Sequence, residues 1–166
     1  MNKELKYIIS PELKSFNKFT PKLKIAVLAS GEGSNFQVLI DLAKNDLFDI
    51  DIKLLICNKK NAGCVKRAND EKIPYFICEE SSCKNRDDFE KKIIKKLRES
   101  DIELIIMAGW MKIVTENLIN SVSKKIINLH PSLLPSFKGK NPIKDALENG
   151  SLITGCSVHY VVPEVD

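Results

Sequence analysis

Short, mostly apolar segments alternate with helical patterns along most of this sequence. Residues 25–29 form a continuous apolar run, which is typical of a strand buried on both faces of a parallel sheet, and residues 50–57 and 102–108 are predicted as the next strands. Between them, apolar residues recur at helical spacing, most clearly over residues 86–100, where the lysines fall on the opposite face. Alternating strands and helices predict an α/β fold: a three-layer, Rossmann-like domain with a mostly parallel sheet.

Turn residues and shorter patterns mark the rest of the predicted domain. Pro142 suits the first turn of a helix, and Gly150 suits its end. Residues 1–21 show no clear period and contain two prolines, so we expect an N-terminal extension, followed by one domain over residues 22–166. The other expected elements are strands over residues 75–78, 125–129 and 154–162 and helices over residues 65–72, 116–121 and 142–149, with a further helix from residue 36 onward.

Length and composition limit the classes of protein to which this chain belongs. With 166 residues, 43% of them hydrophobic and 29% charged, it matches one ordinary globular domain. No apolar run approaches a membrane span and no signal-peptide pattern is visible, so we expect a cytoplasmic protein without a membrane partner. The net charge of +4 comes mostly from lysines on predicted helices, without interleaved aromatic residues, which argues against a nucleic-acid partner.

The cysteines and histidines give little basis for a metal site. The five cysteines form no Cys-x-x-Cys pair, and the chain has two histidines. In a reducing compartment we therefore expect free buried thiols and no bound metal.

The segment Asn128-Leu129-His130-Pro131 follows an apolar run and is the first candidate for chemistry. Side chains alternate along a strand, so Asn128 and His130 are predicted to lie on one face. Pro131 has no N–H for the sheet and ends the strand, and ligands of open parallel sheets bind at the carboxyl ends of strands. On the residues alone, Asn128 is either a turn former or a catalytic amide, and His130 is either a buried structural histidine or a catalytic imidazole.

A second candidate is the loop Ser30-Gly31-Glu32-Gly33-Ser34-Asn35, between the first strand and a helix. Its glycines permit positive φ, while Ser34 and Asn35 can cap the helix and direct polar groups at an anion. Phe36 replaces the third glycine of the dinucleotide fingerprint, and the Gly-Lys-Ser/Thr ending of a Walker A loop is missing. Gly33, Ser34 and Asn35 therefore predict either a monophosphate site or a simple tight turn.

The loop after residues 102–108 is apolar and contains the single tryptophan, Trp110. Such a loop either packs under the core or forms the wall of a slot for a flat ring, and the residues alone do not distinguish these alternatives.

Together these residues resemble the formyltransferases that use 10-formyltetrahydrofolate. The glycine loop narrows the resemblance to the folate-dependent phosphoribosylglycinamide formyltransferases, and the similarity runs from residue 23 to the last residue. Such enzymes transfer the formyl group of 10-formyltetrahydrofolate to the amine of phosphoribosylglycinamide (GAR) in purine biosynthesis, giving formyl-GAR and tetrahydrofolate. The resemblance rests on residues 128–135 and 146–150, on Gly139 and Gly155, and on Ser157, Val158, His159 and Asp166.

The resemblance implies particular roles for these residues. Asn128 and protonated His130 would stabilise the oxyanion of a tetrahedral intermediate, His130 would protonate the departing folate nitrogen, and Asp166 would favour the charged imidazole. Gly33, Ser34 and Asn35 would hold the GAR phosphate. His159 is expected to be structural rather than catalytic. The folate would contact Arg86, Met111, Lys112, Ile113, Val114, Asn128, Val162, Pro163, Glu164, Val165 and Asp166.

The resemblance also implies two small-molecule substrates, no metal, and a monomer or weak dimer. Because the family continues beyond the position of Asp166, we expect the C-terminal part of the domain to be missing from this chain. Residues 141–143 are more like methionyl-tRNA formyltransferases and formyltetrahydrofolate deformylases, but Pro131 argues against a deformylase and the glycine loop against the tRNA enzyme. A nucleotide- or folate-binding module without catalysis is the remaining alternative.

Overall fold

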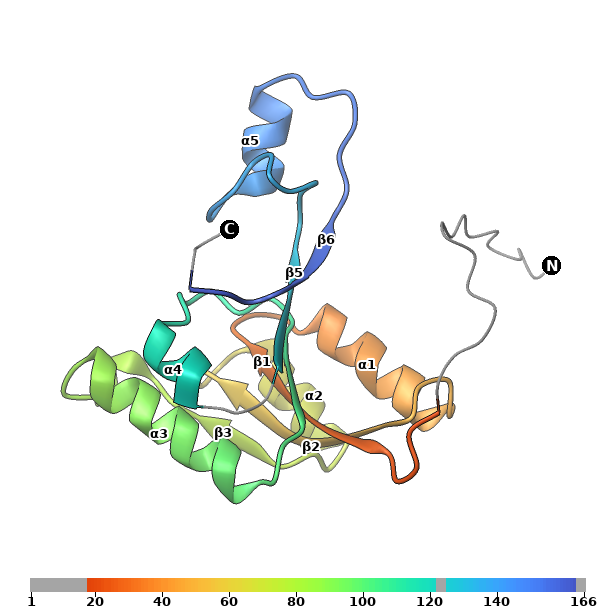
Figure 1. Cartoon of the computed structure of the whole chain (residues 1–166), viewed down its shortest axis with the longest axis vertical. Helices are drawn as coiled ribbons and strands as arrows, with labels where there is room; N and C mark the ends of the chain where they lie inside the picture. Colours follow the sequence, from red (N-terminus) through yellow and green to blue (C-terminus); the bar gives the residue numbers. More distant parts are fainter. Residues whose placement is uncertain (1–17, 122–124, 164–166) are drawn as a thin grey trace.

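The computed structural model describes residues 18–121 and 125–163. In this part of the chain, one sheet of six strands has the order β3-β2-β1-β4-β5-β6 (Figure 1). Neighbouring strands are parallel except β5 and β6, which pair antiparallel. The predicted α/β fold with a mostly parallel sheet is therefore confirmed. The strands are β1 (Leu23–Ala29), β2 (Ile50–Cys57), β3 (Tyr75–Ile77), β4 (Leu104–Met107), β5 (Lys125–His130) and β6 (Ser157–Tyr160).

Helices flank the sheet, and α5 stands apart from the others at the far end of β5 and β6 (Figure 1). The side chain of Asn85 caps α3 by accepting the Asp88 N–H, and acidic residues in the first turn complement the helix dipole. Among the described residues, no helix combines the length and apolar content needed to cross a membrane. The helices are α1 (Ser34–Lys44), α2 (Gly63–Asp70), α3 (Arg86–Glu99), α4 (Glu116–Ser121) and α5 (Pro142–Glu148), with a 3-10 turn, η1 (Glu80–Ser82).

The core has two apolar layers because successive side chains of a strand point to opposite faces of the sheet. Ala26 and Leu28 of β1 pack with residues of α3 and α4, whereas Ile25 and Val27 pack with residues of α1 and α2. All four side chains are at most 1% exposed. Burial on both faces explains why β1 is a continuous apolar run rather than an alternating one.

The start of α1 differs from its prediction. Its N-cap is Gly33, at φ 73°, without a side-chain cap among the described residues, so the expected capping by Ser34 and Asn35 is wrong. The buried residues of α1 include Phe36 and Ile40, one helical turn apart, while Val38 is 55% exposed. Without a capping side chain, the N–H groups of the first turn are the donors that this helix end offers to an anion.

Most other predicted elements are present with shifted ends. β5 ends at His130, one residue beyond the predicted range, and it stops directly before Pro131, as predicted. β6 is shorter than the predicted strand over residues 154–162, because it pairs with β5 only from Ser157 to Tyr160. β4 begins at Leu104 rather than at Ile102, although Ile102 is 3% exposed and belongs to the core.

β1 and β4 lie side by side, and the strand order reverses between them. Ser30, which is 1% exposed, joins the loops that follow these two strands. Its N–H donates to the Gly109 carbonyl oxygen at 3.0 Å, and its Oγ accepts the Met111 N–H at 2.9 Å. Ligands of open α/β sheets bind at such a switch point. We therefore expect a ligand-binding site at the surface near Ser30.

Candidate active site

A cavity of about 800 Å³ lies where β1, β4 and β5 end. Its lining includes Asn35 from the first turn of α1, residues 109–114 from the loop after β4, and residues 128–131 from the end of β5. A single hollow therefore connects the glycine loop with the end of β5. The segments before α5 and on either side of β6 contribute Gly139, Lys140, Pro142, Cys156, Val161 and Val162.

Asn128 and His130 both line this cavity, in agreement with their spacing along β5. His130 is 5% exposed. Its Nε2 lies 3.1 Å from the Phe137 carbonyl oxygen and donates to it, because a carbonyl oxygen can only accept. The contact brings the loop after Pro131 back to the imidazole and fixes the orientation of the ring.

Serine hydroxyls hold the loop that follows Pro131. Ser132 Oγ donates to the Ser136 carbonyl oxygen at 2.6 Å. Ser157 of β6 donates to the Ser132 carbonyl oxygen at 2.8 Å and accepts the Leu134 N–H at 3.0 Å. The carbonyl partner of His130 is therefore part of a loop that is bonded both internally and to β6.

His159 lies directly opposite Asn128 in the β5–β6 pair. Asn128 Nδ2 is 3.2 Å from His159 Nε2, and since an amide nitrogen only donates, Nε2 is the acceptor. The ring proton is then on Nδ1, which donates to the Tyr160 carbonyl oxygen at 3.1 Å. The structural role expected for His159 thereby becomes specific: its ring orients a candidate catalytic amide.

The glycine loop is held against the start of α2. The Gly31 carbonyl oxygen accepts the Cys64 N–H at 3.1 Å. A Cβ atom on Gly33 would lie 2.6 Å from the Cβ of Cys64, so this contact requires glycine. Asn35 lines the cavity, whereas Gly33 and Ser34 are not among its lining residues.

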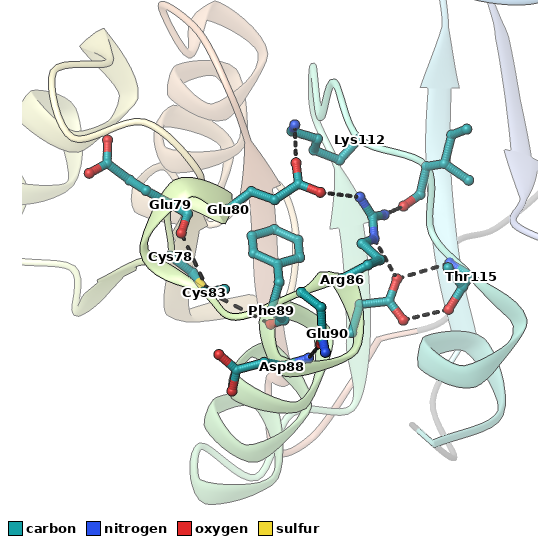
Figure 2. Close-up of polar contacts among 12 residues, drawn as sticks. Cys78, Glu79, Glu80, Cys83, Arg86, Asp88, Phe89, Glu90, Lys112 and Thr115 are labelled. Carbon is teal, nitrogen blue, oxygen red and sulfur yellow. Dashed lines mark hydrogen bonds and ion pairs between the residues drawn. The ribbon is translucent and has the colours of Figure 1, made fainter.

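Charged side chains gather where η1, α3 and the loop after β4 meet (Figure 2). Arg86 donates from Nε to Glu90 at 3.2 Å and from Nη1 to Glu80 at 3.4 Å, and its Nη2 donates to the Ile113 carbonyl oxygen. Lys112 pairs with the same Glu80 carboxylate. The hydrogen bond from Lys112, assisted by Arg86, outweighs desolvation and lowers the pKa of Glu80.

The apolar part of the loop after β4 belongs to both the core and the cavity. The Trp110 ring is 7% exposed and stacks on Phe89, with ring centroids 6.4 Å apart and planes at 15°. Trp110 also lines the cavity. The loop therefore does both of the things considered for it: it packs on the core and forms part of the cavity wall. Met111 and Ile113 are each 62% exposed and give the cavity an apolar surface.

The predicted site residues fall into three groups. Gly33, Ser34 and Pro163 do not line the cavity. Glu164, Val165 and Asp166 lie outside the described residues, so their roles stay predictions. The predicted residues that line the cavity are Asn35, Arg86, Met111, Lys112, Ile113, Val114, Asn128, His130 and Val162.

Sequence reasoning missed Glu80, Glu90, Lys140 and Cys156. Glu80, Lys140 and Cys156 line the cavity, but they lie in segments whose course no local pattern predicts. Glu90 does have a signal, since it precedes Ile93 by three residues on the buried face of α3. The five cysteines are free thiols, as predicted, but their expected burial is wrong for Cys83, which is half-buried, and for Cys156, which is exposed. Within the described residues, no group of three or more His, Cys, Asp or Glu side chains is arranged to hold a metal ion.

The sequence matches known proteins over most of its length. A model of the formyl transferase family matches residues 23–166. The chain is 41% identical over 143 residues to phosphoribosylglycinamide formyltransferase of Bacillus subtilis. This match covers 86% of this chain and 73% of that protein. It is 40% identical over 152 residues to the human trifunctional purine biosynthetic protein adenosine-3. That match covers 92% of this chain and 15% of that protein.

Solved structures share the same arrangement of helices and strands. Glycinamide ribonucleotide transformylase 1 of Geobacillus kaustophilus superposes with a TM-score of 0.84 at 36% identity, covering 87% of this chain and 77% of that one. Phosphoribosylglycinamide formyltransferase of Bacillus halodurans gives a TM-score of 0.83 at 31% identity, covering 86% and 74%. Sequence and fold agree, and this chain belongs to the formyl transferase family.

Proposed function

We propose that this chain transfers the formyl group of 10-formyltetrahydrofolate to the amine of GAR, a step of purine biosynthesis. The observation that supports this most is the cavity that connects Asn35, at the start of α1, with Asn128 and His130, at the end of β5. A phosphate bound at the first place and a formyl group bound at the second would be held within one hollow, as a transfer between two substrates requires.

The GAR phosphate would bind at the N-terminus of α1. The N–H groups of the first turn and the positive end of the helix dipole both favour an anion there. Ser34 and Asn35 are exposed at this helix end and add a hydroxyl and an amide. Gly33 would contribute its backbone, which a side chain at this position would displace from Cys64.

The formyl donor would lie along the loop after β4. Its flat ring fits the exposed apolar surface of Met111 and Ile113, and the backbone of Val114 would contribute polar groups. Arg86 and Lys112 supply positive charge for the carboxylates of its glutamate portion. We also expect contacts from residues 162–166, which follow β6 in the sequence.

The chemistry would take place beside Asn128 and His130. The amine of GAR attacks the formyl carbon, and a tetrahedral intermediate with a negative oxygen forms. The Asn128 amide and a protonated His130 would donate to this oxygen. As the bond between the formyl carbon and N10 of the folate breaks, His130 gives a proton to N10, and the amine releases one proton to a water ordered by Asp166.

Turnover of GAR with 10-formyltetrahydrofolate, followed by the release of tetrahydrofolate, tests the proposal. We expect His130→Ala to lower kcat at least about 100-fold, and Ser34→Ala with Asn35→Ala to raise KM for GAR alone. A wild-type chain without turnover would contradict the proposal. Formate release without GAR would indicate a deformylase, and calorimetric binding of either substrate without turnover would indicate a non-catalytic module.

We expect the chain to act on small molecules only, as a cytoplasmic monomer or weak dimer. Sedimentation velocity at micromolar concentrations measures the oligomeric state. Turnover that survives treatment with a chelator would agree with metal-free chemistry, whereas loss of turnover that added metal restores would contradict it.

A further inference from the structure

Glu90 is a carboxylate inside an otherwise apolar face of α3. It is 2% exposed, and its neighbours on that face, Phe89 and Ile93, are at most 1% exposed. A buried carboxylate is retained only where hydrogen bonds replace its lost hydration. Its partners therefore indicate what Glu90 does.

These partners come from two different segments of the chain. One Glu90 oxygen accepts Arg86 Nε at 3.2 Å and the Thr115 N–H at 3.3 Å. The other oxygen accepts the Thr115 hydroxyl. Arg86 also donates to the Ile113 carbonyl oxygen, and the chain itself connects Ile113 with Thr115. Glu90, Arg86 and residues 113–115 therefore form a closed ring, and Figure 2 shows the contacts of Glu90 with Arg86 and Thr115.

The closed ring ties the first turn of α3 to the loop after β4. Arg86 and residues 111–114 line the cavity, whereas Glu90 lies behind them and is not a lining residue. The loop has a further anchor at its start, where the Met111 N–H bonds to Ser30. Glu90 fixes the end of the loop through Thr115, so the cavity-lining stretch is held at both ends.

We propose that Glu90 is a positioning residue for the formyl donor, an inference that rests on the proposed function. It aims the Arg86 guanidinium and orders the loop after β4 before the substrate binds. Without the negative charge of the carboxylate, the bonds from Arg86 Nε and the Thr115 N–H weaken, and the substrate has to order these groups itself. Affinity for the folate then falls, while the phosphate end of the cavity keeps its own scaffold in α1 and α2.

Glu90→Gln is the direct test, because glutamine keeps the size of the side chain and one acceptor oxygen but removes the negative charge that strengthens the bonds from Arg86 and Thr115. The matched control is Glu99→Gln, since Glu99 is 49% exposed and pairs only with Lys96 on the same helix, at 3.6 Å, among the contacts of the described residues. We expect Glu90→Gln to raise KM for 10-formyltetrahydrofolate about ten-fold, with kcat and KM for GAR unchanged. The control should match the wild type.

Hydrogen exchange gives a readout that does not depend on turnover. In Glu90→Gln, amides of residues 111–115 should exchange faster than in the wild type, while those of β1 and β2 keep their protection. Should Glu90→Gln prove too unstable to assay, Thr115→Val removes one partner of the carboxylate and should weaken folate binding about three-fold.

The two proposals fail in different ways. If the wild type neither binds the folate nor turns over, the proposed function fails and the positioning role fails with it. If the wild type is active but Glu90→Gln keeps the wild-type KM for the folate, or raises KM for GAR equally, only the positioning role is overturned. Unchanged exchange at residues 111–115 would also overturn it.

Discussion

The Asn128 amide donates to His159 Nε2 at 3.2 Å, across the antiparallel pair of β5 and β6. One proton of the amide nitrogen is thereby engaged, and the other is held in a fixed direction. The imidazole can accept this bond only because its own proton is on Nδ1, where the Tyr160 carbonyl oxygen receives it. The amide that is proposed to stabilise the oxyanion thus owes its orientation to a residue of the neighbouring strand.

Removing His159 should therefore slow the formyl transfer without affecting substrate binding. We expect His159→Ala to lower kcat about three- to ten-fold, as the loss of one orienting hydrogen bond implies. His159→Gln should recover part of the loss, because its side-chain oxygen can accept the same N–H. Steady-state kinetics checks both variants, and wild-type kcat in His159→Ala would show that Asn128 holds its orientation unaided.

Gly33 should tolerate no side chain. In Gly33→Ala the new methyl group would lie 2.6 Å from Cβ and 2.8 Å from Cα of Cys64, at a φ of 73°. We expect the free energy of unfolding to fall by about 3 kcal/mol, from left-handed strain and from overpacking.

Gly150→Ala is the control for Gly33→Ala. Gly150 has φ 65° but nothing within 4 Å of the added Cβ, so it measures the backbone strain alone, about 1 kcal/mol. Urea denaturation compares the two variants. Equal losses of stability would mean that the Gly33–Cys64 contact relaxes without penalty.

Ser30 should matter for stability, because it is buried and bonds the loop after β1 to the loop after β4. Ser30→Ala leaves the Met111 N–H without its acceptor, and we expect the free energy of unfolding to fall by about 1–3 kcal/mol. Ser82→Ala, which removes an exposed hydroxyl bonded to the Glu79 carbonyl oxygen at 2.6 Å, should change stability by less than about 0.5 kcal/mol. Thermal melts check the pair, and a neutral Ser30→Ala would contradict the assigned role.

Glu80 competes with any acidic ligand for Arg86 and Lys112. Glu80→Gln removes the negative charge that pairs with Lys112 and with Nη1 of Arg86, so we expect folate affinity to rise about three-fold, as calorimetry would detect. A weaker affinity would mean that Glu80 contacts the ligand favourably.

The effect of Glu80 should depend on pH in a defined direction. The pKa of this carboxyl is lowered from its usual 4.5 by Lys112 and Arg86. Its contribution to stability is therefore fully present above pH 4.5 and is lost as the pH falls through the lowered pKa. The stability difference between wild type and Glu80→Gln should be seen at pH 7 and vanish in acid, which denaturation at several pH values measures.

Several strands could be predicted because each contains a short apolar run or ends at a strong local signal. β5 ends where Pro131 removes a backbone donor, and burial on both faces accounts for the apolar runs over residues 25–29 of β1 and 54–57 of β2. Local patterns do not decide which apolar side chains of α1 are buried. Val38 is as apolar as its neighbours but is 55% exposed, whereas Phe36 and Ile40 pack with strand residues in the core.

The charged part of the site could not be predicted because it depends on contacts between distant segments. Lys112 and Glu80 are 32 residues apart, and Thr115 and Glu90 are 25 apart. No periodicity relates them, since the approach of η1, α3 and the loop after β4 is decided only when the sheet assembles. Asn128 and His130, two residues apart on one strand, needed no such information.

Ser30 connects the backbone of the loop after β1 with that of the loop after β4, through bonds of 3.0 and 2.9 Å. The relative position of the two loops is therefore fixed beneath the cavity, by one bond between main-chain groups and one to a buried hydroxyl that is not itself a lining residue. Exchanging the side chains that line the cavity would leave this link between the loops intact.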